Sequence, residues 1–391
     1  MGNKFTSKIL KALLAVGPGL FLIGYNIGTG SVTTMAKSGA EHGMTLFWAL
    51  VLSCIFTYVL MVAYGQVTLV TGNTALFNIK SNFKFGKILA IYILVALIIG
   101  ELLALMGIMG IVADLLQEGI RLLTGDIMST LWITVFLTIG LFIMLWYGAY
   151  QKFEKLLTFF VIMMGLCFII VFFMVKPSLS VILRGLIPGI PKQDGAFQLV
   201  AAMAGTTCSA AVFIMRSVVV SEKGWKIDNL RSEKKDAFVS AGMMLFLSGT
   251  IMAVSAGTLH LMGLKLDNTV EMIHLLEPIG GKTAAFILIL GVAGAGLSTV
   301  FPIILIAPWL ICDYTGKPRD IRTPLFRILG IIGLLFGFGL QFLKQRPPTM
   351  MVFSQAFQAC ILPAVAIPIF ILINRRSVMN QHKSDAKMNT A

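Results

Sequence analysis

The sequence has few charged residues and little of the chemistry that enzymes use. Charged residues make up 12% of its 391 residues and hydrophobic residues 57%, a balance that excludes an ordinary soluble domain. It has only four histidines, no serine–histidine–acid constellation and no phosphate-binding glycine-rich loop. The sequence therefore does not indicate an enzyme, and no cofactor is expected.

Cysteine is scarce as well. The five cysteines stand singly in apolar stretches, without the spacing of a metal cluster or of a disulfide framework. No low-complexity linker divides the chain. We therefore expect free thiols and a single transmembrane domain over residues 1–391.

Long apolar stretches are what the sequence has in abundance. A helix crosses the bilayer with about 20 apolar residues, and ten stretches reach that length. This predicts an all-α, multi-pass integral membrane protein whose main partner is the lipid bilayer. The ten predicted spans cover residues 10–40, 44–71, 86–112, 127–148, 153–175, 197–221, 237–263, 282–312, 324–343 and 349–374.

A net charge of +14 is also typical of nucleic-acid-binding proteins, but here the basic residues are concentrated in the loops on one side of the predicted membrane topology. With ten spans, the loops on the side of the two termini carry 21 of the 31 Lys and Arg residues, and the opposite loops carry nine. Basic loops stay in the cytoplasm. We therefore expect both termini in the cytoplasm of a cell-membrane protein and no nucleic-acid partner; the sequence names no protein partner.

Two of the apolar stretches are interrupted by small polar residues, GYNIGTGS at 24–31 and AGTTCSAA at 204–211. Non-helical backbone at membrane depth is tolerated only where protein buries it or where it lines a cavity. A matching pair of breaks indicates a secondary transporter that works by alternating access. Because the breaks open spans one and six, they predict two inverted five-helix repeats, 1–175 and 197–374, followed by a cytoplasmic tail at 377–391.

The first break offers Asn26, Gly28, Thr29 and Ser31 as candidate substrate-binding residues. Glycine permits the backbone angles of an unwound segment, and Ser31 can cap a restarted helix. The alternative is close helix packing, since Gly24 and Gly28 also form a GxxxG pattern.

The second break offers Thr206, Thr207 and Ser209, and the tenth span offers Gln355. The second break contains no proline, so a continuous helix with small residues for close packing is its alternative. Gln355 either faces the cavity or satisfies a backbone group freed by the nearby prolines.

Two charges, Glu101 and Arg216, lie deep in apolar spans. Ionisable residues inside a membrane face the bundle interior and are paired. One reading is a structural Glu101–Arg216 ion pair. The other places Glu101 on an ion or proton path, with Arg216 affecting its protonation.

Several segments resemble the Nramp family of divalent-metal transporters, in the same order along nearly the whole chain. They are GPGLFLIGYNIGTGSVTTMAKSGAEHG at 17–43, VTG at 70–72, FEKLL at 153–157, GLIPGIP at 185–191, GTTCSAAVFIMRSVVV at 205–220 and SQAFQACILPAVAIP at 354–368. The resemblance implies a leucine-transporter-type fold with broken first and sixth helices.

Residue by residue, this sequence departs from the family at its metal ligands. The family's DPGN is Gly28-Thr29-Gly30-Ser31 here, so the aspartate is missing, and its MPH is Ser209-Ala210-Ala211, so the methionine is missing too. Arg216 replaces a histidine associated with proton movement. Glu101 and Gln355 match the family's glutamate in the third helix and glutamine in the tenth.

These departures leave three hypotheses. The first is transport of a partly hydrated divalent ion, Mg²⁺ or Mn²⁺, with Ser31, Ser209 and Gln355 as the metal ligands. The second is transport of a small organic solute such as an amino acid, whose carboxylate the restarted helix N-termini would favour. The third is a membrane sensor that binds but does not transport.

Overall fold

The computed structural model describes residues 28–147, 150–276, 280–317, 319–320, 322–343 and 345–380. Throughout these residues the chain is helical and has no strand. The tail expected from residue 377 begins with the short helix α17, and residues 381–391 lie outside the described part. The helices are α3 (Thr29–His42), α4 (Phe47–Thr71), α5 (Ala75–Asn82), α6 (Gly86–Thr124), α7 (Thr130–Tyr147), α8 (Tyr150–Val175), α9 (Leu179–Arg184), α10 (Ala196–Thr207), α11 (Ala210–Glu222), η1 (Ile227–Asn229), α12 (Leu230–Gly257), η2 (Thr269–Leu276), α13 (Gly281–Thr315), α14 (Pro324–Phe336), α15 (Gly339–Leu343), α16 (Pro347–Asn374) and α17 (Arg376–Met379).

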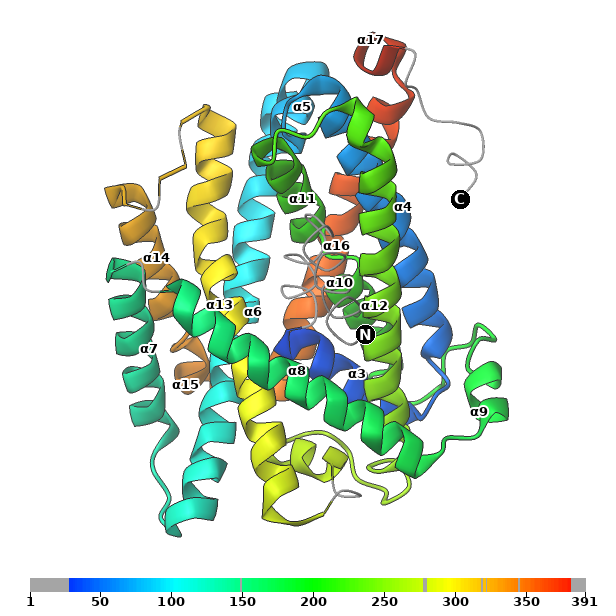
Figure 1. The fold of residues 1–391 in the computed structure, drawn as a ribbon, viewed down its shortest axis with the longest axis vertical. Helices are drawn as coiled ribbons and strands as arrows, with labels where there is room; N and C mark the ends of the chain where they lie inside the picture. Colours follow the sequence, from blue (N-terminus) through cyan, green and yellow to red (C-terminus); the bar gives the residue numbers. More distant parts are fainter. Residues whose placement is uncertain are drawn as a thin grey trace, which may run out of the picture.

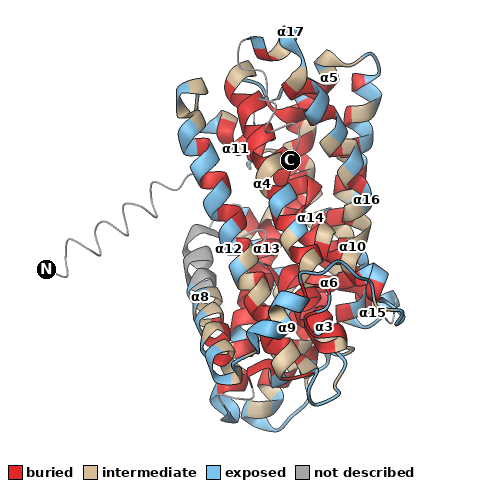
Figure 2. Cartoon of the chain, turned by 90° about the vertical axis from the view of Figure 1, so that its right-hand side faces the viewer, coloured by how far each residue is buried: buried red, intermediate tan, exposed pale blue. Residues whose placement is uncertain are grey.

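Eight helical segments of the described chain are long and apolar enough to cross a membrane. α8 has 26 residues, of which Phe159–Val175 form an apolar stretch, and of the predicted first span only the part from Gly28 onward is described. The outer faces of the bundle are apolar. On α6, for example, Ile88, Tyr92 and Val95 are 68%, 54% and 47% exposed, as side chains in contact with lipid would be. Figure 2 shows such exposed residues on the outside of the helices and buried residues within.

The centre of the bundle is built from α3, α6, α10 and α16 (Figure 1). α16 packs against both α10 and α6, while α12 packs against α3 and α4. α13 lies against α6 and α8. Helices from both halves of the sequence therefore enclose the same central space.

The predicted break in the sixth span is present. α10 ends at Thr207, and α11 begins at Ala210. Between them, Cys208 (φ −103°, ψ 47°) and Ser209 (φ −66°, ψ 125°) are not helical. In the first span α3 begins at Thr29, after the extended residue Gly28 (φ −82°, ψ −174°), and the residues before Gly28 lie outside the described part. Ser31 therefore lies inside α3 and does not cap it, because the helix begins earlier than predicted.

The seventh span differs from its predicted range of 237–263. Its helix, α12, begins at Leu230 and ends at Gly257. It begins earlier because Glu233 and Asp236, which look like loop residues in the sequence, are buried against Arg216. It ends earlier because the chain turns back, with the His260 N–H donating to the Ser255 carbonyl.

Candidate functional site

A small cavity of about 40 Å³ lies where the two breaks meet. The helices around it are α3, α6, α10, α13 and α16, and the break between α10 and α11 opens onto it. It is lined by Gly28, Gly30, Ser31, Glu101, Ala104, Ile108, Thr206, Ser209, Thr299, Ile303, Met351, Gln355 and Gln358.

Hydrogen bonds connect the polar side chains of this cavity. Ser31 Oγ and Thr206 Oγ1 are 2.9 Å apart, so the two broken segments are in direct contact. Ser209 Oγ donates to Gln358 Oε1 over 2.8 Å, and Gln358 Nε2 donates to Glu101 Oε1 over 3.2 Å. The second break is thus connected to the carboxylate of α6 through one glutamine of α16.

Five predicted substrate-binding residues line the cavity: Gly28, Ser31, Thr206, Ser209 and Gln355.

Two other predicted residues do not line it. Thr29 Oγ1 donates to the Val292 carbonyl, and Thr207 Oγ1 donates to the Met203 carbonyl of its own helix. Both hydroxyls therefore bond to backbone carbonyl groups and do not face the cavity. The predicted Asn26 lies outside the described residues.

The cavity also contains residues that the sequence did not predict. Thr299 of α13 and Met351 of α16 both line it. Met351, Gln355 and Gln358 are spaced by four and three residues, so they lie on one face of α16. That spacing was the available sequence signal, although a methionine in an apolar span looks like ordinary core.

The predicted ion pair between Glu101 and Arg216 is wrong. Arg216 Nε contacts Glu233 Oε1 at 2.7 Å, and its Nη2 contacts Asp236 Oδ2 at 2.9 Å. The Arg216 side chain is fully buried there, and the two carboxylates stand three residues apart on one face of α12. Arg216 therefore joins α11 to α12.

The donor set of the cavity is mostly neutral oxygen. Among the described residues that line it, Glu101 is the only ionisable one, and it is 2% exposed. Four hydroxyls, two amides and one thioether complete the polar lining. No group of three or more His, Cys, Asp or Glu residues suited to a metal occurs in the described part of the chain. The set resembles the oxygen surroundings of hard cations more than a zinc-type site.

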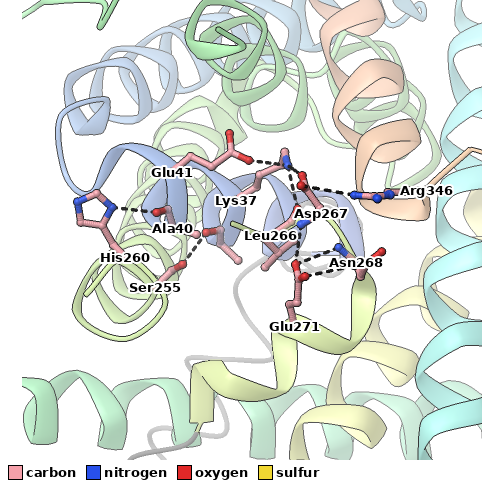
Figure 3. A network of polar contacts seen from close by, with 11 residues as sticks. Lys37, Ala40, Glu41, Ser255, His260, Leu266, Asp267, Asn268, Glu271 and Arg346 are labelled. Atoms are coloured by element: carbon pink, nitrogen blue, oxygen red, sulfur yellow. Dashed lines mark hydrogen bonds and ion pairs between the residues drawn. The ribbon is translucent and has the colours of Figure 1, made fainter. Parts of the chain in front are cut away.

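A second polar cluster, the Lys37 network, lies further along α3 (Figure 3). It comprises Lys37, Glu41, Asp267 and Arg346. Lys37 Nζ lies 2.6 Å from Glu41 Oε1 and 3.0 Å from Asp267 Oδ1, and it also donates to the Leu266 carbonyl. Arg346 Nη1 is 3.5 Å from Asp267 Oδ2. The network thereby links α3 to the loop after α12 and to the start of α16.

Within the Lys37 network, the pKa of Asp267 is shifted. The hydrogen bond from Lys37 holds this pKa below its ordinary value of 3.8, against the opposing effect of partial burial. Asp267 is therefore a carboxylate at neutral pH.

The family and the fold follow from comparison with known proteins. Residues 19–391 match the family described as natural resistance-associated macrophage protein-like, Nramp. The divalent metal cation transporter MntH of Pectobacterium carotovorum is 25% identical over 382 residues, covering 96% of this chain and 89% of that protein. The natural resistance-associated macrophage protein 2 homolog of Dictyostelium discoideum is also 25% identical, covering 98% of this chain and 61% of that longer protein.

Solved structures show the same fold. A manganese transporter of Eremococcus coleocola superposes with a TM-score of 0.69 at 17% identity, covering 98% of this chain and 84% of that one. Mhp1, a nucleobase-cation-symport-1 family transporter, superposes with a TM-score of 0.65 at 17% identity, covering 94% and 80%. Both are leucine-transporter-type structures. This chain belongs to the Nramp family and is a multi-pass membrane transporter, not an enzyme.

Proposed function

We propose that this protein transports a divalent metal ion, Mn²⁺ or Mg²⁺, by alternating access, and that the ion binds partly hydrated in the central cavity. The observation that carries the proposal is the cavity itself. It lies between the two broken segments and contains one carboxylate, from Glu101, among neutral oxygens. The names of the relatives, which include divalent metal cation transporters and a manganese transporter, support the same substrate class.

The size of the cavity favours an ion over an organic solute. A water molecule requires roughly 10–15 Å³ by this measure of volume, so about 40 Å³ accommodates an ion with a few waters. The carboxylate of an amino acid would also approach the Glu101 carboxyl group, which repels it when ionised.

The charge of the cavity favours a cation. A dication among neutral oxygens alone would be poorly compensated, but the Glu101 carboxyl group at the cavity can supply a negative charge. Ser31, Ser209 and Gln355 remain the proposed metal ligands from the breaks and the tenth span, now with Glu101 beside them. Mg²⁺ and Mn²⁺ both accept such carboxylate, hydroxyl and amide oxygens, with water in the remaining positions.

Alternating access requires contacts that can break on either side of the cavity. On one side, the Lys37 network holds α3 against the loop after α12 and against α16. On the other, Arg319 contacts Glu222 at 2.8 Å and Asp313 at 2.7 Å, which links α11 to the end of α13. We assign the Arg319 end to the cytoplasm, with both termini, and the Lys37 network to the outer face of the cell membrane. Residues 1–175 and 197–374 would be the two inverted repeats that move against each other.

The test is ion uptake into proteoliposomes that contain ion-sensitive dyes, with the voltage clamped by a potassium ionophore. Saturable uptake of Mn²⁺ or Mg²⁺ is expected, and Gly28→Trp should abolish it because the new side chain would fill the cavity. Folded protein that takes up neither ion would overturn the proposal. Uptake of an amino acid would then support the organic-solute hypothesis, and ion binding without uptake would support a sensor.

A further inference from the structure

Met351 of α16 is not among the metal ligands proposed above. It is 1% exposed and lines the central cavity on the same face of α16 as Gln355 and Gln358. A buried methionine usually fills space in a core. At a polar cavity proposed to hold a cation it can also act as a ligand, because thioether sulfur binds metal ions.

The surroundings of Met351 leave room for its side chain beside the first break. A Cβ added to Gly30 would lie 2.6 Å from Met351 Cε and 2.7 Å from Gln355 Nε2. The end of the methionine and the amide of Gln355 therefore approach the same point of α3. On the other side, a Cβ added to Gly107 of α6 would lie 3.0 Å from Met351 Sδ. Glycines on two different helices thus create the space that the thioether occupies.

The chemistry of the lining makes this sulfur distinctive. The other polar groups at the cavity are oxygens and amide nitrogens from Ser, Thr, Gln and Glu side chains. Oxygen ligands suit Mg²⁺, Ca²⁺ and Mn²⁺ alike, whereas thioether sulfur favours softer, more polarisable ions. A single sulfur among oxygens would therefore change the relative affinities of divalent ions, although the carboxylate would still attract all of them.

We propose that Met351 determines ion specificity by offering its sulfur to the bound ion, so that the site prefers softer divalent ions over Mg²⁺. The proposal rests on the proposed function, since it requires a divalent ion in the central cavity. Cd²⁺, a soft dication, is the most sensitive probe of such a ligand, and Mg²⁺ is the hard reference.

The experiment measures the dissociation constants of Cd²⁺, Mn²⁺ and Mg²⁺ by calorimetry on detergent-purified full-length protein. Met351→Leu removes the sulfur and keeps a side chain of similar volume. It should weaken Cd²⁺ binding by roughly tenfold or more, about 1.4 kcal/mol, weaken Mn²⁺ binding less, and leave Mg²⁺ binding within about twofold. Met350→Leu is the matched control, because Met350 is adjacent on α16 and is not among the residues that line the cavity.

A purely structural methionine would change all three affinities together or none, and either result would overturn the role of Met351 while leaving metal binding intact. A wild-type protein that binds none of the ions would instead overturn the proposed function, and with it this role. X-ray absorption at the cadmium edge on the Cd²⁺-loaded wild type is a second test that needs no variant. A sulfur neighbour of the bound Cd²⁺ is expected, and a coordination shell of oxygen alone would refute the proposal.

Discussion

Ser31 Oγ and Thr206 Oγ1 lie 2.9 Å apart, although their residues are 175 positions apart in the sequence. Each hydroxyl belongs to one of the two broken spans, so the breaks meet at the wall of a single cavity. A site shared by both breaks is what alternating access requires, because movement of either half changes the site.

Glu101→Gln should weaken divalent-ion binding by more than about tenfold. The substitution keeps the shape of the side chain but removes the charge of the only ionisable residue among the described residues of the cavity. The measurement is calorimetry with Mn²⁺. Asp126→Asn, in an exposed loop, removes the same charge far from the cavity and should leave binding unchanged. Equal affinities of Glu101→Gln and wild type would show that the ion does not use this carboxylate.

Gly30→Ala should abolish ion binding in a protein that still folds. The added Cβ would lie 2.6 Å from Met351 Cε and 2.7 Å from Gln355 Nε2, so these side chains must move into the small cavity. Folding should survive because alanine is the better helix former by about 1 kcal/mol. Gly242→Ala on α12 is the control, since its Cβ would meet open space. The measurements are thermal unfolding, which reports on folding, and titration with Mn²⁺, which reports on binding. Folded Gly30→Ala protein that binds Mn²⁺ like the wild type would contradict the prediction.

Arg216→Ala should destabilise the protein by about 3–5 kcal/mol, because it leaves Glu233 and Asp236 buried without their shared guanidinium. The midpoint of thermal unfolding in detergent should fall, whereas Mn²⁺ affinity of the remaining folded protein should change little. Arg231→Ala, on the exposed side of α12, is the matched control. If Glu101→Gln rescued the stability of Arg216→Ala, then Arg216 would be the partner of Glu101 after all.

The Lys37 network should be insensitive to pH between about 5 and 8. The pKa of Asp267 is lowered by its hydrogen bond from Lys37, so the stabilisation is present above the ordinary value of 3.8 and is lost only as the pH falls through the lowered pKa. Hydrogen exchange of the loop residues 264–268, which lie beyond His260 and next to Asp267, should therefore change little from pH 8 to pH 5 after correction for intrinsic rates.

Asp267→Asn should speed that exchange throughout the same pH range, because it removes the charge that Lys37 and Arg346 contact. Lys282→Gln, at the exposed start of α13, should not. A wild-type loop that lost protection between pH 7 and pH 5 would contradict the assigned role of Asp267.

Much of the fold could be predicted from the sequence because hydropathy and helix breaks are local signals. Apolar length predicts the spans, and the run of small residues at 204–211 predicts the break that the structure places at Cys208 and Ser209. Ser31, Thr206 and Ser209 reach the cavity because they lie at the breaks themselves.

The partners of Arg216 could not be predicted in this way. Each helical residue turns the side chain by about 100°, and a non-helical break resets that rotation. The direction of Arg216, seven residues after Ser209, therefore depends on the geometry of the break. Its partners were not evident either, since Glu233 and Asp236 lie within a basic stretch that looks like a solvent-exposed loop.

Met351 was missed for a different reason. In an apolar span its sulfur is not distinguishable from core packing, and only the position of Gln355 four residues later connects it with the cavity. Thr29 and Thr207 illustrate the opposite error. Threonine hydroxyls near a break also satisfy backbone carbonyls, and these two do so.

The most direct measurement is anomalous X-ray diffraction from crystals of the full-length protein grown with Mn²⁺. The account predicts a manganese peak in the central cavity, bounded by Glu101, Ser209 and Gln355, that disappears in crystals of folded Gly30→Ala protein. A peak only at the other polar pocket, beside Asp313 and Glu222, or no peak in well-diffracting crystals at saturating Mn²⁺, would contradict it.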